Sequence, residues 1–221
     1  MPAHYAIAID GPAASGKSTL ARNLADRLGL VMVNSGAMYR AITWQALRLG
    51  IEPSDHPAVV AMLDGLEIIC GENGIESTIL INGIDPSPEL RHESINAHVS
   101  EISAIPQVRE RLVALQRGYL EHTNVIMEGR DIGTVVFPDT PYKIFVIADQ
   151  SVRTHRRVEA GEADSVLARD VADSSRATSP LRQAEDAVLL DTSHHDIETA
   201  VQAALVILRG QGLEFDCSLL T

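Results

Sequence analysis

The chain has 221 residues, which is enough for one domain with a sizeable buried core, and its formal net charge of −12 argues against a protein that coats nucleic acid or an anionic membrane. Its two cysteines cannot form a disulfide framework, and no apolar run approaches the ~20 residues of a membrane span. The first apolar stretch runs directly into a glycine-rich loop, unlike a signal peptide, so we expect a cytoplasmic protein.

Short apolar runs alternate with helical patterns along the chain. The runs predict buried strands at 6–9, 30–34, 124–128, 143–148 and 187–193. Amphipathic spacing with plausible ends predicts helices at about 17–28, 37–50, 92–103, 106–121 and 196–210. This alternation indicates an α/β fold with a central parallel sheet and right-handed crossovers.

Two segments break the alternation. Residues 64–85 contain two short apolar runs around "GENG", which predicts an antiparallel hairpin inserted into the parallel fold. Residues 151–180 are polar and arginine-rich, and we expect them to form a mobile segment rather than part of the core.

A phosphate-binding loop is predicted between the first strand and the first helix. The sequence Gly11-x4-Gly16-Lys17-Ser18 matches the P-loop pattern, in which backbone N–H groups and a helix N-terminus surround phosphates. Lys17 can reach the β- and γ-phosphates of a nucleotide, and the Ser18 hydroxyl can bind Mg²⁺. The residues expected to hold ATP are Gly11, Pro12, Ala13, Ala14, Ser15, Gly16, Lys17, Ser18 and Thr19.

The loop alone does not name the reaction, because switches, motors and kinases share it. The chain has no "NKxD" motif of the kind that reads guanine. "FVIAD" (145–149) resembles the acidic strand of motor ATPases, but "VIME" (125–128) competes for the same role. A chain of this size with an arginine-rich segment favours a kinase of a small acceptor.

Arginines are the second candidate feature, since a planar guanidinium binds phosphate with two hydrogen bonds and stays charged. Arg130 follows a buried strand at the edge where open α/β sheets bind ligands, so we expect it to be functional. A single arginine on a helix surface is more often solvated. The remaining candidates are Arg40, Arg153, Arg156, Arg157, Arg169 and Arg176.

Five motifs, in order, resemble the bacterial cytidylate kinase family: "IDGPAASGKST", "NSGAMYRA", "GRDIGTVVFPD", "RDVADSSRATSPL" and "DAVLLDTS". The resemblance covers about residues 5–208. It implies transfer of the γ-phosphoryl group of ATP to CMP or dCMP with Mg²⁺, in a monomer with a P-loop three-layer fold. It also implies one domain over 1–221, with a core (about 1–63 and 104–221), a monophosphate-binding insertion (about 64–103) and an arginine-rich lid (about 151–180).

The resemblance also implies roles for individual residues. Those expected around the acceptor phosphate are Ser35, Arg40, Arg130 and Arg176. Those expected to read the cytosine edge are Ser100, Arg109 and Asp131. Arg169 and Asp173 would contact the acceptor ribose or phosphate from the lid side, and Lys17, Arg130 and Arg176 would be catalytic. An aspartate suits the exocyclic amine of cytosine and would meet an oxygen lone pair in uracil, which selects against UMP.

The chain departs from the family pattern at a few places. Asn34 and Glu128 stand where aspartate is common, and the segment 157–170 is shorter than the usual lid. Two alternatives stay open at this point. One is a P-loop kinase of another acceptor, such as UMP, AMP or a non-nucleotide, and the other is a nucleotide-binding protein without turnover.

Overall fold

A seven-stranded sheet forms the centre of the molecule. The computed structural model describes residues 4–159, 161, 166–175 and 178–220, with only the backbone for 168, 169 and 220. Within these residues the strand order is β3-β4-β2-β5-β1-β6-β7, and the last five strands in this order are mutually parallel. The strands are β1 Ala6–Asp10, β2 Val31–Asn34, β3 Ile68–Asn73, β4 Glu76–Ile81, β5 Val125–Gly129, β6 Lys143–Ile147 and β7 Val188–Asp191.

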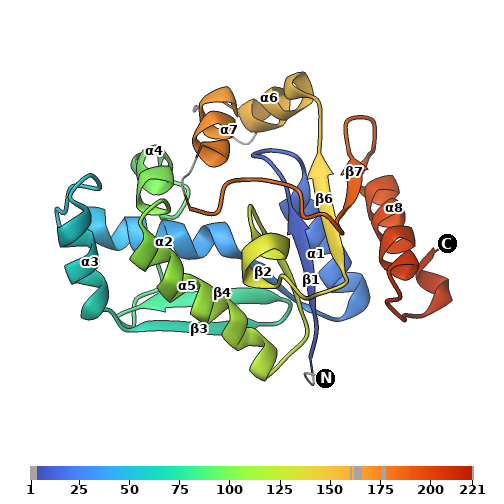
Figure 1. Cartoon of the computed structure of the whole chain (residues 1–221), viewed down its shortest axis with the longest axis horizontal. Coiled ribbons are helices and arrows are strands. Elements are labelled where there is room, and N and C mark those ends of the chain that lie inside the picture. Colours follow the sequence, from blue (N-terminus) through green and yellow to red (C-terminus); the bar gives the residue numbers. More distant parts are fainter. Residues whose placement is uncertain (1–3, 160, 162–165, 176–177, 221) are drawn as a thin grey trace.

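Helices cover both faces of the sheet, which confirms the three-layer α/β prediction (Figure 1). They are α1 Lys17–Leu28, α2 Ser35–Arg48, α3 His56–Asp64, α4 Glu93–Ile102, α5 Pro106–Gly118, α6 Gln150–Glu159, α7 Val166–Ser174 and α8 Ile197–Gly210. Strand β1 shows how the alternation of side chains separates two cores: Ala6 and Ala8 face the core of α2–α5, and Ile7 and Ile9 face the core of α1 and α8. The small alanines leave room for the larger helical layer.

The predicted hairpin is present, and it belongs to the main sheet. Strands β3 and β4 pair antiparallel from Ile68↔Ile81 to Asn73↔Glu76, as predicted. The start of β4 also pairs with β2 through Met32↔Glu76, so the hairpin extends the parallel sheet at one edge. The sequence pattern shows the antiparallel pair but not this junction.

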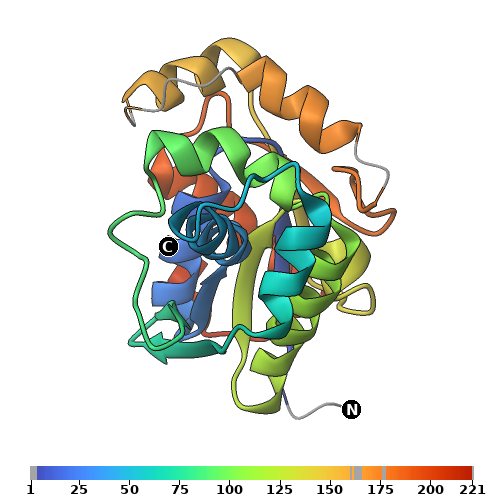
Figure 2. The same ribbon diagram turned by 90° about the vertical axis from the view of Figure 1, so that its left-hand side faces the viewer.

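The sequence analysis misses α3 and predicts no helix within residues 151–180. Helix α3 begins at an aspartate cap, since the amide of Ala58 donates to Asp55 Oδ1 at 3.1 Å. The described part of 151–180 forms α6 and α7, which lie across the carboxyl ends of the strands (Figure 2). Neither hydrophobic core cluster of the described residues includes a member of this segment, although the charged side chains of Arg153, Arg157 and Asp173 are buried.

In the part of the chain that the structure describes, no helix combines the length and apolar character needed to cross a membrane.

Candidate active site

A cleft of about 750 Å³ opens above the carboxyl ends of the parallel strands. The phosphate-binding loop lines one part of it, the end of β5 lines the middle, and α2, α4 and α5 line another part. Helix α6 also contributes to its wall. Open α/β sheets bind ligands at this edge, and the predicted phosphate site and acceptor site share this one cleft.

The phosphate-binding loop turns into α1 at Gly16, which has φ 87° and stands at the N-cap. A Cβ atom at Gly11 would lie 2.1 Å from the Val146 carbonyl oxygen, so the loop packs too closely on β6 for any side chain there. The Ser15 hydroxyl is buried, and no partner for it is found within the described residues. A buried hydroxyl of this kind calls for a ligand or solvent to satisfy it.

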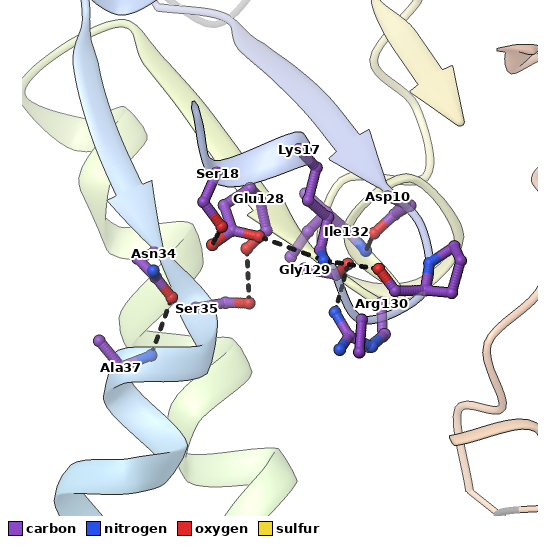
Figure 3. A network of polar contacts seen from close by, with 12 residues as sticks. Asp10, Lys17, Ser18, Asn34, Ser35, Ala37, Glu128, Gly129, Arg130 and Ile132 are labelled. Atoms are coloured by element: carbon purple, nitrogen blue, oxygen red, sulfur yellow. Dashed lines mark hydrogen bonds and ion pairs between the residues drawn. The ribbon is translucent and has the colours of Figure 1, made fainter. Parts of the chain in front are cut away.

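Lys17 lies on the floor of the cleft, and only 6% of its surface is exposed. Its Nζ donates to the Pro12 carbonyl at 2.9 Å and lies 3.9 Å from Glu128 Oε2 (Figure 3). Burial and, after it, the nearby charge of Arg130 lower the pKa of Lys17, and with the opposing charges of Glu128, Asp173 and Asp10 the pKa is about 7. Phosphate groups in the cleft would supply negative charge to this partly compensated ammonium.

Ser18 and Glu128 form the second polar pair of the loop. The Ser18 hydroxyl donates to Glu128 Oε1 at 2.8 Å (Figure 3). Two hard oxygen donors beside a phosphate site fit Mg²⁺, which binds few protein groups and takes its other ligands from phosphates and water. Asp149, in the competing "FVIAD" motif, is exposed and outside the cleft lining, so the geometry favours Glu128.

Two of the predicted acceptor-phosphate residues, Ser35 and Arg130, lie at the end of β5. The Ser35 hydroxyl donates to the Glu128 carbonyl at 2.7 Å, and Arg130 Nε donates to Asp173 Oδ2 at 2.6 Å. Burial opposes the charge of Arg130, but the Asp173 carboxylate beside it holds its pKa above the ordinary value. Arg40 reaches the same cleft from α2, where its Nε donates to Asn96 Oδ1 at 3.3 Å.

The three predicted base readers line another part of the cleft. Arg109 and Asp131 form a buried ion pair, and Arg109 also donates to the Ser103 carbonyl at 3.1 Å and stacks on the Tyr39 ring. The Nε atom of Arg109 is buried and has no acceptor among the described residues. Ser100, on α4, lines the same cleft as this pair. The site therefore presents a carboxylate, a guanidinium and a hydroxyl at one place.

Comparison with known proteins decides the family. The family model for cytidylate kinase matches residues 7–209. A cytidylate kinase of Clostridium botulinum (strain Langeland / NCTC 10281 / Type F) is 40% identical over 217 residues, which cover 93% of this chain and 98% of the relative. One of Streptococcus pneumoniae (strain 70585) is 43% identical over 211 residues, covering 89% and 93%. The protein belongs to the cytidylate kinase family. It is therefore an ATP-dependent kinase, as the resemblance implies.

The arginines of the α6–α7 segment divide into two groups in this family member. Arg156 donates to Thr192 Oγ1 at 3.2 Å and to its carbonyl at 3.0 Å, and both Arg156 and Arg157 line the cleft. Arg153 instead donates to the Ala13 carbonyl at 3.2 Å and pairs with Asp170, so it joins α6 and α7 to the phosphate-binding loop. The predicted side chains of Arg169 and Arg176 lie outside the described residues.

Most of the predicted phosphate-binding loop lines the cleft. The lining members are Ala13, Ala14, Gly16, Lys17, Ser18 and Thr19. The other three members, Gly11, Pro12 and Ser15, are not part of the lining. Asn34, which stands where aspartate is common in the family, caps α2, because its Oδ1 accepts from the Ala37 amide at 3.0 Å.

Sequence reasoning missed two residues of the site. The Thr192 hydroxyl donates to the Ser15 carbonyl at 2.8 Å, which supports the loop from β7, and its place in "DAVLLDTS" was the available signal. Asp10 is 5% exposed and accepts from two amides just after Asp131. A charged residue that ends an otherwise apolar strand was the signal for Asp10.

Proposed function

We propose that the protein transfers the γ-phosphoryl group of ATP to CMP or dCMP, giving ADP and CDP or dCDP. One observation carries the choice of acceptor. The buried Arg109–Asp131 pair lines the same cleft as the phosphate-binding loop. Its carboxylate matches the exocyclic amine of cytosine, and the Arg109 Nε–H, which has no acceptor among the residues that the structure describes, matches a ring acceptor. The names of the relatives support the same acceptor.

The donor half of the site would hold the triphosphate on the loop amides and Lys17. Ser18 and Glu128 would hold Mg²⁺, the glutamate through water or directly. When bound, the ion neutralises charge on the transferring phosphoryl group and orients the phosphates. Lys17, already buried and 2.9 Å from a loop carbonyl, is placed to follow the charge that develops on the γ-phosphoryl oxygens.

The acceptor half would use Ser35, Arg40 and Arg130, together with the proposed Arg176. The attacking group is a phosphate oxygen that is already an anion at neutral pH, so this chemistry requires no general base. Catalysis then consists of holding two anions in line and stabilising the charge between them. Arg130 would exchange part of its contact with Asp173 for the acceptor phosphate, while Asp173 and the proposed Arg169 would contact the ribose or phosphate from the α7 side.

The division into a core, an insertion at 64–103 and a lid at 151–180 is part of this proposal. In it, α4 of the insertion brings Ser100 to the base, and α6 and α7 of the lid bring arginines to the phosphates. We also propose a monomer in the cytoplasm. Two cysteines and no framework for a disulfide-rich fold suit a reducing compartment.

The test is to offer the purified protein ATP and Mg²⁺ with CMP, dCMP, UMP, AMP, GMP or dTMP in separate reactions. ADP formation and the phosphorylated product are both measured. We expect strong turnover with CMP or dCMP, weak turnover with UMP, and none after chelation of Mg²⁺. A preference for another monophosphate would overturn the base-reading assignment, and ADP formation without phosphorylated cytidine nucleotide would overturn the acceptor.

Two variants on α5 make this test specific. Arg109→Ala removes the buried guanidinium, whereas Arg111→Ala removes an exposed one two residues away on the same helix. We expect the first to lose its preference for CMP over UMP and the second to keep it. Equal preferences in the two variants would contradict the role of Arg109.

A further inference from the structure

The carboxylate of Asp10, at the end of β1, contacts the backbone that follows the neighbouring strand β5. It is the last residue of β1, and it is paired in register with Gly129 of β5. Its Oδ1 accepts from the Ile132 amide at 2.8 Å, as drawn in Figure 3, and its Oδ2 accepts from the Gly133 amide at 2.7 Å. Both oxygens of the carboxylate are therefore used on two consecutive amides, and hydrogen bonds to an ionised group are the strong ones.

These two amides follow directly after Asp131, where the backbone turns sharply. Asp131 has φ −146° and ψ 26°, and it precedes a short π-helical turn over Ile132–Val136. The direction of its side chain depends on how that turn is held. Asp10 holds the first two residues of the turn, at a position where no side chain of the turn itself accepts from an amide.

The far end of the turn is held by other groups. Arg117 donates to the carbonyls of Val135 and Val136 at 2.7 and 2.9 Å. Lys143 Nζ donates to the Pro138 carbonyl at 2.6 Å. A loss of Asp10 would therefore release the beginning of the turn next to Asp131, while the end stays attached.

Keeping a carboxylate at this place is costly. Burial and, to a smaller extent, the charge of Asp131 raise the pKa of Asp10, the two amide hydrogen bonds and Lys17 act against this, and the resulting pKa is about 6. An alcohol or an amide would satisfy one of the two N–H groups at less cost in desolvation. The carboxylate is the side chain that accepts from both N–H groups at once.

We propose that Asp10 is a positioning residue for recognition of the acceptor base, because it fixes the turn that presents Asp131 to Arg109. This rests on the proposed function, in which Asp131 and Arg109 read cytosine. Asp10 itself makes no contact with the nucleotide in this assignment. Its effect reaches the acceptor through the backbone of residues 131–133.

The experiment measures KM for CMP, KM for ATP, and kcat/KM for CMP and UMP in the wild type and in Asp10→Asn. Asparagine keeps the size of the side chain but turns an NH₂ group toward one of the two amides. We expect KM for CMP to rise about tenfold and the CMP/UMP preference to fall about tenfold, as for a lost base contact, while KM for ATP changes little.

A core variant separates positioning from loss of stability. Val201→Ala shortens a buried side chain of α8, which lies in the same core as Ile7 and Ile9 of β1, without touching the turn. We expect it to lower the melting temperature and to leave the CMP/UMP preference of the wild type. If Asp10→Asn changes the preference no more than Val201→Ala does, or raises both KM values equally, the inference is wrong. A wild type that does not prefer cytidine nucleotides would instead overturn the proposed function.

Discussion

The substitution Asp131→Asn tests the buried ion pair and the base assignment in one protein. It keeps the shape of the side chain and removes the charge opposite Arg109. The two side chains are 7% and 4% exposed, so solvent cannot replace the lost partner. Breaking a buried pair costs about 3–5 kcal/mol, and we expect the lower value, about 3 kcal/mol, because Arg109 keeps its contacts with Ser103 and the Tyr39 ring.

This loss should lower the melting temperature by about 6–12 °C in a protein of this size. The second consequence concerns specificity. A lost base-edge contact is worth about 1–3 kcal/mol, so the CMP/UMP ratio of kcat/KM should fall by a factor of about 5–150.

Thermal melts and steady-state kinetics with CMP and UMP measure the two effects. Asp139→Asn is the matched control, because it removes an exposed carboxylate from the same connection between β5 and β6. We expect this control to resemble the wild type in both assays. A melting temperature for Asp131→Asn equal to that of the control would refute the energetic reasoning, and an unchanged CMP/UMP ratio would remove Asp131 from base recognition.

Three further predictions address the phosphate-binding loop and Asp10, which directly precedes it. Lys17→Ala should lower kcat about 10²–10³-fold, and it should not lower the melting temperature, because it also removes a buried ammonium group. Coupled assays measure kcat and thermal melts measure stability. Unchanged turnover would exclude the P-loop role of Lys17. Ala14 has φ 58°, so Ala14→Gly should relieve left-handed strain and raise the melting temperature by about 2–4 °C, and a decrease would contradict this. The raised pKa of Asp10 favours the folded state below about pH 4, and this contribution is lost as the pH rises through about 6. In urea melts between these pH values, the free energy of unfolding of Asp10→Asn should therefore depend less on pH than that of the wild type, by up to about 3 kcal/mol. The same pH dependence in both proteins would contradict the raised pKa of Asp10.

Local sequence patterns predict much of the secondary structure of this fold. Helix α1 runs from Lys17 to Leu28 as predicted, because Gly16 and Gly29 mark its ends with left-handed conformations. The buried strands are recognisable as short apolar runs between turn residues. Helix α3 was missed because it is short, although two start signals, the cap at Asp55 and Pro57 in the first turn, were visible in the sequence.

Local sequence patterns do not show which strands are neighbours in the sheet. The contact of Asp10 with the Ile132 amide joins residues 122 positions apart, and it exists because β1 and β5 are adjacent in the sheet. The junction Met32↔Glu76 depends on strand order in the same way.

The site shows the same division. Residue types and motifs were enough to predict Lys17, Ser18 and Arg130 in one cleft. Their partners were not predictable, since Arg130 pairs with Asp173 only because α7 lies across the end of β5. The base readers came from the family resemblance, because a serine at a helix end and an arginine on a helix carry no signal alone.

The contacts that hold α6 and α7 over the strands have a thermal consequence. Arg130 and Asp173 form an ion pair, and Arg153 reaches the phosphate-binding loop by a hydrogen bond to the Ala13 carbonyl. Of the apolar side chains that the structure describes on α7, Val166 is buried, whereas Leu167 and Val171 are exposed to solvent. Heat capacity changes follow the apolar area that becomes exposed. If α7 opens as part of the proposed lid, little apolar area would become exposed. The van't Hoff plot for this opening should therefore be nearly straight, whereas the plot for global unfolding should be strongly curved. Cooling would then weaken the hydrophobic stabilisation of the two cores, while the contacts that hold α6 and α7 over the cleft would change little in strength.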